Sequence, residues 1–215
     1  MNPQETKQAQ IAATLERAPV VPVVIIEDAA HAVPMARALV AGGTPAIEVT
    51  LRTPAALDAV RAIASEVEGA IVGVGTVLGA AQLQDAEAAG AKFAVSPGAS
   101  PALLDAADAS ALPLLPGAAT AGEAMTLLER GYRFQKFFPA AYAGGPKLLG
   151  AWASPLPGIR FCPTGGIKPE TANDYLNLAN VVCVGGSWLT PKDALAGGDW
   201  DRIERLAREA AALKA

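Results

Sequence analysis

The chain has 215 residues, of which 52% are hydrophobic and 18% are charged, and its formal net charge at neutral pH is −4. This composition is typical of a globular domain with a large core, and it excludes an intrinsically disordered chain. The acidic balance, the absence of a Lys/Arg cluster and the absence of an apolar run of about 18 residues argue against nucleic-acid and membrane partners.

Few of the side chains that usually bind metals are present. There is one histidine, His31, in an alanine-rich stretch, and the two cysteines, Cys162 and Cys183, lie in apolar strand-like runs. The first ten residues are polar and do not resemble a secretion signal, so we expect reduced core thiols and a cytoplasmic location. One histidine and two cysteines are too few ligands for a zinc site, and we expect neither a metal nor another cofactor. Acid–base chemistry would then depend on carboxylates, lysine, hydroxyls or water.

After a first helix over residues 3–17, strand-like and helix-like segments alternate along the chain. Eight β/α units of roughly 25 residues predict a (β/α)8 TIM barrel with an additional N-terminal helix, as a single domain over residues 1–215. A doubly wound open sheet is the alternative, but no G-x-G-x-x-G follows the first strand. The expected strands are 20–26, 46–51, 70–74, 93–95, 113–115, 132–138, 159–162 and 181–184, and the helices between and after them are 29–41, 54–67, 79–89, 101–109, 121–130, 144–152, 169–178 and 199–213.

The second predicted strand carries three polar residues at alternate positions. Because side chains alternate across a strand, Glu48, Thr50 and Arg52 should point one way and Val49 and Leu51 the other. A Glu48–Arg52 ion pair would account for this pattern without any function. The pattern also suits catalysis, because a guanidinium at a strand end can bind a substrate carboxylate and an interior glutamate can act as an acid–base group.

Lys136 lies in the middle of an apolar run that Pro139 ends. An unpaired ammonium is costly to bury, so burial favours the neutral amine, which is a nucleophile toward carbonyl carbon. This stretch therefore indicates imine chemistry. The alternative is a lysine on the outer face of its strand, extending past a helix to reach water.

Two glycine pairs follow the last two predicted strands, where (β/α)8 barrels commonly bind phosphate. Each pair stands beside a hydroxyl residue, and the exposed backbone N–H groups there would suit an anion. Thr76 follows the third strand, and two roles fit it equally well: capping a helix or turn, and contacting the substrate. These features predict a substrate with a carbonyl, a carboxylate and a distal phosphate. The segments are Thr164-Gly165-Gly166 and Gly185-Gly186-Ser187.

Six segments in chain order, which cover strands two to eight, together resemble the 2-keto-3-deoxy-6-phosphogluconate (KDPG) and 4-hydroxy-2-oxoglutarate (KHG) aldolase family. The resemblance implies a class I, Schiff-base aldolase of the Entner–Doudoroff pathway, which cleaves KDPG to pyruvate and glyceraldehyde 3-phosphate. It also implies that no metal is needed and that the enzyme is a homotrimer. The six segments are Glu48-Val-Thr-Leu-Arg52-Thr, Gly73-Val-Gly-Thr76-Val, Ser96-Pro-Gly98, Lys136-Phe-Phe-Pro-Ala140, Pro163-Thr-Gly-Gly-Ile167 and Val184-Gly-Gly-Ser-Trp188.

The resemblance also implies a role for each matching residue. Lys136 corresponds to the imine-forming lysine and Glu48 to the general acid–base, while Ala141 departs from the glutamate that relatives often carry, which leaves this loop in doubt. The remaining matches are Arg52 and Thr76 as contacts to the substrate carboxylate, Pro97, Phe138 and Thr164 as further substrate-binding residues, and Gly165, Gly166, Gly186 and Ser187 as the phosphate cradle.

Three alternatives stay open at this point. The motifs do not separate KDPG from its C4 epimer, 2-dehydro-3-deoxy-6-phosphogalactonate, or from unphosphorylated 4-hydroxy-2-oxoglutarate. A phosphosugar isomerase or epimerase would use the same glycine loops without an imine. A non-catalytic phosphosugar-binding protein would have little reason to bring Glu48, Arg52 and Lys136 together.

Overall fold

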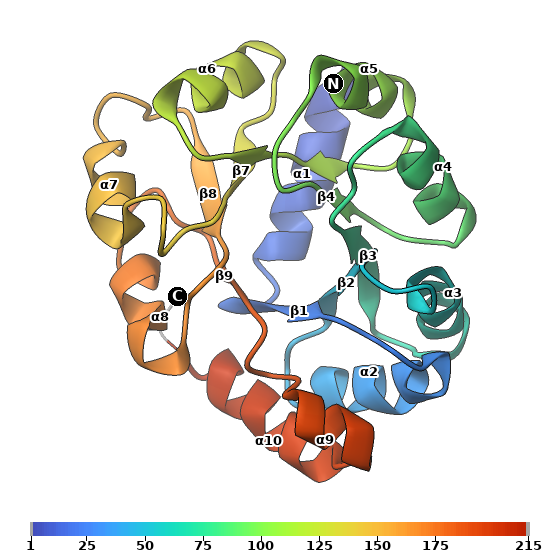
Figure 1. Cartoon of the computed structure of the whole chain (residues 1–215). Helices are drawn as coiled ribbons and strands as arrows, with labels where there is room; N and C mark the ends of the chain where they lie inside the picture. The colour runs from blue at the N-terminus through green and yellow to red at the C-terminus, as the bar shows by residue number, and fades with distance from the viewer. Residues whose placement is uncertain (1, 214–215) are drawn as a thin grey trace.

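The computed structural model describes residues 2–213 and shows an α/β protein in which a curled parallel sheet is surrounded by helices (Figure 1). The strands are β1 (Val20–Val24), β2 (Ala46–Thr50), β3 (Ile71–Gly75), β4 (Ala94–Val95), β5 (Leu114–Leu115), β6 (Gly117–Ala118), β7 (Phe134–Phe137), β8 (Arg160–Pro163) and β9 (Val184–Gly186). The helices are α1 (Pro3–Leu15), η1 (Ala29–His31), α2 (Ala32–Ala41), α3 (Ala56–Glu66), α4 (Ala80–Ala88), α5 (Pro101–Ala109), α6 (Ala121–Glu129), α7 (Gly145–Ala151), α8 (Pro169–Leu176), α9 (Lys192–Gly197) and α10 (Trp200–Ala211).

The strands form two hydrogen-bonded groups, in the orders β5-β4-β3-β2-β1-β9 and β6-β7-β8, and every pair is parallel. Pro116 alone separates β5 from β6. Proline has no N–H to donate, which accounts for a break at this point. Two parallel bridges, Phe161 to Val181 and Thr164 to Gly185, connect the β8 segment to the β9 segment.

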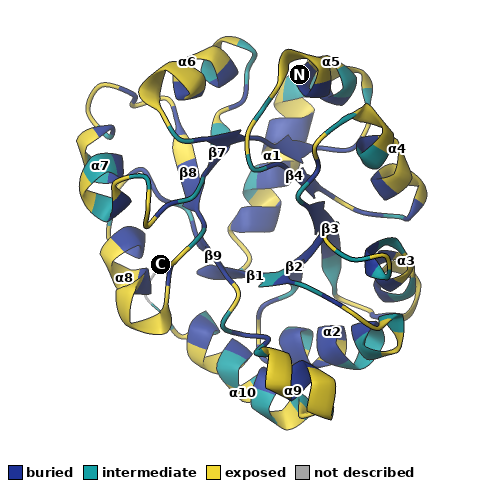
Figure 2. Cartoon of the chain, in the orientation of Figure 1, coloured by how far each residue is buried: buried dark blue, intermediate teal, exposed yellow. Residues whose placement is uncertain are grey.

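The interior of the curled sheet is closed at one end by α1. Ile11 and Leu15 of α1 pack against side chains that point inward from the strands, including Phe93 and Leu115. In Figure 1 this helix lies in the middle of the ring of strands. A larger apolar cluster fills the space between the strands and the outer helices, whose exposed faces are yellow in Figure 2. The interior near α1 is therefore apolar and filled, and a polar site has room only toward the other end of the strands.

Local chemistry explains several helix starts. Asn2 accepts a hydrogen bond from the N–H of Glu5, whose carboxylate accepts one in return, which begins α1. Thr120 and Glu123 form the same reciprocal cap at α6. Asp28 caps the turn η1 by accepting a hydrogen bond from Ala30, so the helix predicted from residue 29 begins as a 3₁₀ turn.

The structure differs from the predicted elements in a few short segments. The last strand lies at residues 184–186 instead of 181–184, and Val181 contributes only a single bridge. The strand β6 and the helix α9 were not predicted, because both are too short to show a periodic pattern. The strand β6 has two residues, next to Pro116, and the helix α9 has six. Within residues 2–213, no helix combines the length and apolar composition that a membrane span requires.

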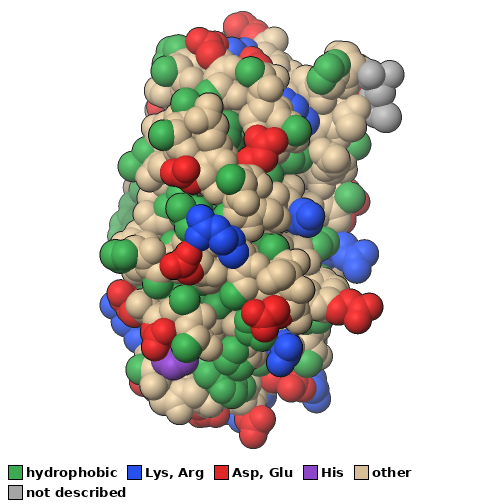
Figure 3. All heavy atoms as spheres, turned by 90° about the vertical axis from the view of Figure 1, so that its right-hand side faces the viewer, with side chains coloured by type: hydrophobic (Ala, Val, Ile, Leu, Met, Phe, Trp, Pro, Cys, Tyr) green, Lys and Arg blue, Asp and Glu red, His purple; other side chains and the backbone are tan. Residues whose placement is uncertain are grey.

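The side of the molecule at α3 and α4, shown in Figure 3, carries acidic and basic side chains mixed with scattered hydrophobic ones. Neither sign of charge dominates this face. It therefore lacks the basic footprint expected of a nucleic-acid-binding surface.

Because of Tyr132, the folded protein should lose stability at alkaline pH. It is buried, and its hydroxyl donates a 2.8 Å hydrogen bond to Asp108. Burial, followed by the Asp108 carboxylate, raises the pKa of Tyr132 above its usual value of 10.0. The folded state therefore favours the neutral phenol, and this stabilisation is complete below about pH 10 and is lost as the pH rises further.

We expect the free energy of unfolding to fall between about pH 9 and about pH 11, and to fall less in Tyr132→Phe. Urea unfolding at the two pH values measures this. Tyr142→Phe is the control, because Tyr142 is 83% exposed, and it should keep the wild-type fall. An equal fall in Tyr132→Phe would contradict the assignment.

Candidate active site

The amine of Lys136 lies inside the ring of strands and contacts the carboxylate of Glu48. The Nζ–Oε1 distance is 3.1 Å, and the side chains are 5% and 4% exposed. The Nζ atom also lies 5.3 Å from the centre of the Phe138 ring. This geometry rules out a lysine on the outer face of β7. It places an amine and a carboxylate within proton-transfer distance and away from bulk water.

Glycines leave space around this pair. Gly73 on β3 lies opposite Glu48, and Gly117 on β6 lies opposite Lys136. A Cβ atom on Gly75 would stand 2.1 Å from Glu48 Oε1, and one on Gly117 would stand 2.3 Å from the Pro97 carbonyl oxygen. Side chains at these positions would fill the space that the carboxylate and the neighbouring loop occupy.

Arg52 and Thr76 form a second polar contact, where β2 and β3 end. Arg52 Nε donates to Thr76 Oγ1 at 3.1 Å, so Glu48 and Arg52 have different partners and do not form the simple ion pair. Thr76 has a φ angle of 62°, which is uncommon for a β-branched residue. Within residues 2–213, the two terminal guanidinium nitrogens of Arg52 make no hydrogen bond, so they remain available to an anion.

Arg52 also lines a cavity of about 130 Å³ that the glycine loops enclose. Gly165 and Gly166 have φ angles of 100° and 76°, which a residue with a side chain rarely adopts. They directly precede the short loop into α8, so their N–H groups are close to a helix N-terminus, where anions are favoured. The rest of the lining comes from Val23, Ile25, Thr164, Ile167, Gly185 and Ser187.

This site can be compared with known proteins. The family model for KDPG and KHG aldolase matches residues 11–206. The chain belongs to this family. It is 55% identical over 194 residues to the 2-dehydro-3-deoxy-phosphogluconate aldolase of Pseudoalteromonas atlantica, which covers 90% of each chain. It is 56% identical over 196 residues to the KHG/KDPG aldolase of Escherichia coli, which covers 91% of this chain and 92% of the relative.

Solved structures of this aldolase family show the same architecture. The aldolase of Zymomonas mobilis with 3-phosphoglycerate has a TM-score of 0.91 at 48% identity, over 95% of this chain and 96% of that one. The aldolase of Legionella pneumophila, with pyruvate captured as a covalent carbinolamine intermediate, has a TM-score of 0.91 at 43% identity, over 94% and 98%. The fold is therefore TIM-barrel-like.

Most of the residues that the aldolase resemblance selected lie close together. Arg52, Thr164, Gly165, Gly166 and Ser187 line the cavity. Three more border it or the buried pair: Thr76 contacts Arg52, the Phe138 ring lies near both Lys136 and Gly165, and Pro97 abuts Gly117.

Gly186 is arranged differently. A Cβ atom on Gly186 would stand 2.2 Å from the Trp188 ring, whereas Gly185 faces Thr164 and lines the cavity. Strand alternation could have identified this, because it places residue 185 and Ser187 on the same face of the strand. Gly185 and Ile25 line the cavity but were not among the residues to which the resemblance gave a phosphate-binding role.

The two thiols are core residues, as predicted. Cys162 and Cys183 are free and buried, and both belong to the apolar cluster beside α1. A hydrogen bond with Cys162, and then burial, raises the pKa of Cys183. Both effects keep this thiol protonated and unreactive.

Proposed function

We propose that this chain is a class I aldolase, a carbon–carbon lyase that cleaves KDPG to pyruvate and glyceraldehyde 3-phosphate in the Entner–Doudoroff pathway. The observation that carries the proposal is the buried Lys136–Glu48 contact of 3.1 Å, beside a glycine-lined cavity. A metal-free aldolase needs an amine for the ketone and a nearby base for the hydroxyl proton.

The first half of the reaction forms an imine. Lys136 Nζ gives up a proton and, as the neutral amine, attacks the C2 carbonyl carbon of the substrate. The carbinolamine then takes up one proton and loses water to give a protonated imine. The positive nitrogen can then accept the electron pair of the bond that breaks. The Phe138 ring, 5.3 Å from Nζ, helps to stabilise a cation at this position.

The second half breaks the carbon–carbon bond. Glu48 takes the proton of the C4 hydroxyl, the C3–C4 bond breaks, and its electron pair forms an enamine while glyceraldehyde 3-phosphate leaves. Glu48 then returns the proton to C3, and water hydrolyses the protonated imine to release pyruvate and Lys136, which keeps the imine proton as an ammonium. One carboxylate thus moves one proton in each direction, which balances the reaction.

The remaining residues hold the substrate. Arg52 and Thr76 bind the carboxylate and so align the C3–C4 bond with the imine. The distal phosphate is bound by the backbone N–H groups and the hydroxyl of the glycine loops, near the start of α8. The proposed contacts are Pro97, Phe138 and Thr164 for the chain of the substrate and Gly165, Gly166 and Ser187 for the phosphate. Gly186 would take part only through the backbone that it shares with Gly185 and Ser187.

The proposal extends to the architecture and the assembly. We take the single domain to be a closed (β/α)8 barrel in which β5 and β6 are one interrupted strand and α1 is the additional N-terminal helix. The bridges between the β8 and β9 segments support this closure. The homotrimer rests on the family resemblance, and sedimentation of the purified chain tests it. The cytoplasmic location rests on the two buried thiols and the polar start of the sequence, and the absence of a cofactor rests on the few metal-binding side chains together with the resemblance.

A substrate panel tests the activity. Pyruvate release from KDPG, from its C4 epimer and from 4-hydroxy-2-oxoglutarate should be highest with KDPG and measurable with 4-hydroxy-2-oxoglutarate, because the Escherichia coli relative is named for both substrates. A preference for the epimer would assign the alternative aldolase. Interconversion of a phosphosugar without any pyruvate would assign an isomerase or epimerase.

Gly75→Ala tests the placement of Glu48 without changing either member of the pair. The new methyl group would collide with Glu48 Oε1, so the carboxylate must move away from Lys136. We expect kcat for KDPG cleavage to fall by about 10²-fold, the cost of a misplacement near 1 Å. The control is Gly122→Ala, where a Cβ atom would meet nothing within 4 Å. Unchanged kcat in a folded Gly75→Ala enzyme would refute this placement.

A further inference from the structure

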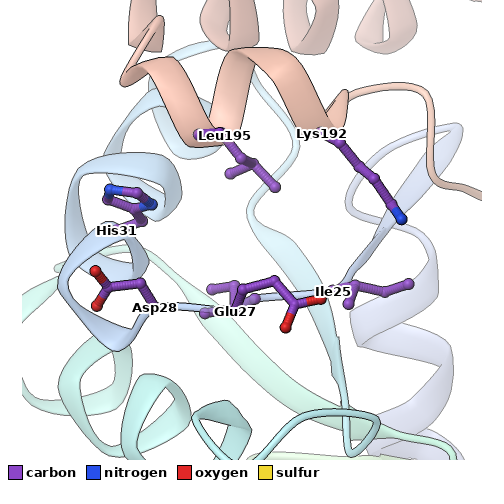
Figure 4. A pocket seen from close by; sticks show the side chains of 8 residues that line it. Ile25, Glu27, Asp28, His31, Lys192 and Leu195 are labelled. Carbon is purple, nitrogen blue, oxygen red and sulfur yellow. The ribbon is translucent and has the colours of Figure 1, made fainter.

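A second cavity, larger than the one beside the buried pair, lies on the same side of the molecule. Its volume is about 320 Å³, and it lies between the segment that follows β1 and the helix α9. In Figure 4, Leu195 reaches into it from α9, and Ile25 lies at one edge, below Lys192. The apolar part of its wall consists of Ile25, Ile26, Leu195 and Ala196.

Among residues 2–213, Ile25 is the one residue that lines both cavities. It belongs to the wall of the 130 Å³ cavity, together with Arg52 and Ser187, and to the wall of the 320 Å³ cavity. The half-buried side chain of Ile25 therefore separates the proposed phosphate cradle from a larger apolar space. No residue of the catalytic pair takes part in this wall.

We infer that Ile25 is a specificity-determining residue that limits the length of the aldehyde half of the substrate. This inference rests on the proposed aldolase function. With isoleucine at position 25, the chain of the substrate must end in the small glycine-lined cavity, which suits a short chain with a terminal anion. With a smaller side chain, the two cavities join and a longer chain can continue into the second one.

The chemistry of the second cavity selects the kind of chain that it would accept. Its apolar wall favours alkyl groups, since burying each methylene is favourable. Glu27 and Asp28 place two carboxylates in the lining, together with the ammonium of Lys192 and the imidazole of His31, and the carboxylates outnumber the one ammonium. A second phosphate or carboxylate would be repelled there, so the substrate class is 4-hydroxy-2-oxo acids with a neutral alkyl tail.

The test compares kcat/KM for pyruvate release from KDPG and from a 4-hydroxy-2-oxo acid that carries an unbranched hexyl tail. In Ile25→Ala, we expect the ratio of the alkyl to the phosphorylated substrate to rise by about tenfold or more over wild type, as burial of several methylenes implies. Ile25→Val should give a smaller rise, and it also serves if the alanine variant does not fold.

Leu195→Ala is the matched control. It enlarges the second cavity from its far wall but leaves the Ile25 wall in place, so the ratio should stay within about twofold of wild type. The inference is wrong if folded Ile25→Ala and Ile25→Val both leave the ratio unchanged, or if Leu195→Ala raises it equally. Failure of the proposed function is a different result, because wild type would then release no pyruvate from KDPG.

Discussion

Lys136→Met is expected to lower kcat for pyruvate release by at least about 10⁴-fold, because it removes the amine that forms the imine. The wild-type enzyme, incubated with pyruvate and borohydride, should gain one reduced adduct on the peptide that contains Lys136. The methionine variant should gain none. Mass spectrometry of the digested protein measures both outcomes, and an adduct on another lysine would refute the assignment.

The same substitution also affects folding, and a double variant separates this effect from catalysis. Lys136→Met leaves the buried Glu48 carboxylate without its partner, which we expect to cost about 3 kcal/mol of unfolding free energy. Lys136→Met combined with Glu48→Leu removes both charges and should restore most of that loss. Its activity should stay absent. Recovery of both stability and activity would show that the pair is structural only.

Much of this site can be predicted from the sequence because its main residues stand out in short local patterns. Strand alternation placed Glu48 and Arg52 on one face, and the interrupted apolar run singled out Lys136. The pairing itself could not be predicted from the residues, because Lys136 and Glu48 are 88 positions apart and the curl of the sheet brings them together. The simple Glu48–Arg52 pair was a less favoured alternative that the sequence left open.

The features that sequence reasoning missed arise from geometry across the chain. Gly185, not Gly186, lines the cavity because β9 continues to residue 186, beyond the predicted end of the last strand, so that Gly185 and Ser187 face the same side. The second cavity needs both the segment after β1 and α9, a helix of only six residues. Neither segment carries a periodic pattern long enough to predict such a contact.

Glu48→Gln is expected to separate imine formation from proton transfer. Glutamine keeps the size of the side chain but cannot accept and return a proton. We expect kcat for KDPG cleavage to fall by about 10²- to 10⁴-fold, the usual contribution of a positioned acid–base group. The Lys136 amine remains, so the borohydride adduct with pyruvate should still form.

Proton exchange at the methyl group of pyruvate gives a second, independent measurement. Formation of the enamine from the pyruvate imine requires a base to remove a C3 proton, so the wild-type enzyme should exchange the methyl protons of pyruvate for deuterium in D₂O. Glu48→Gln should form the adduct but lose this exchange, whereas Lys136→Met should lose both. If Glu48→Gln exchanged the methyl protons at the wild-type rate, the proton carrier would have to be another group, even though the Glu48 carboxylate lies 3.1 Å from the amine.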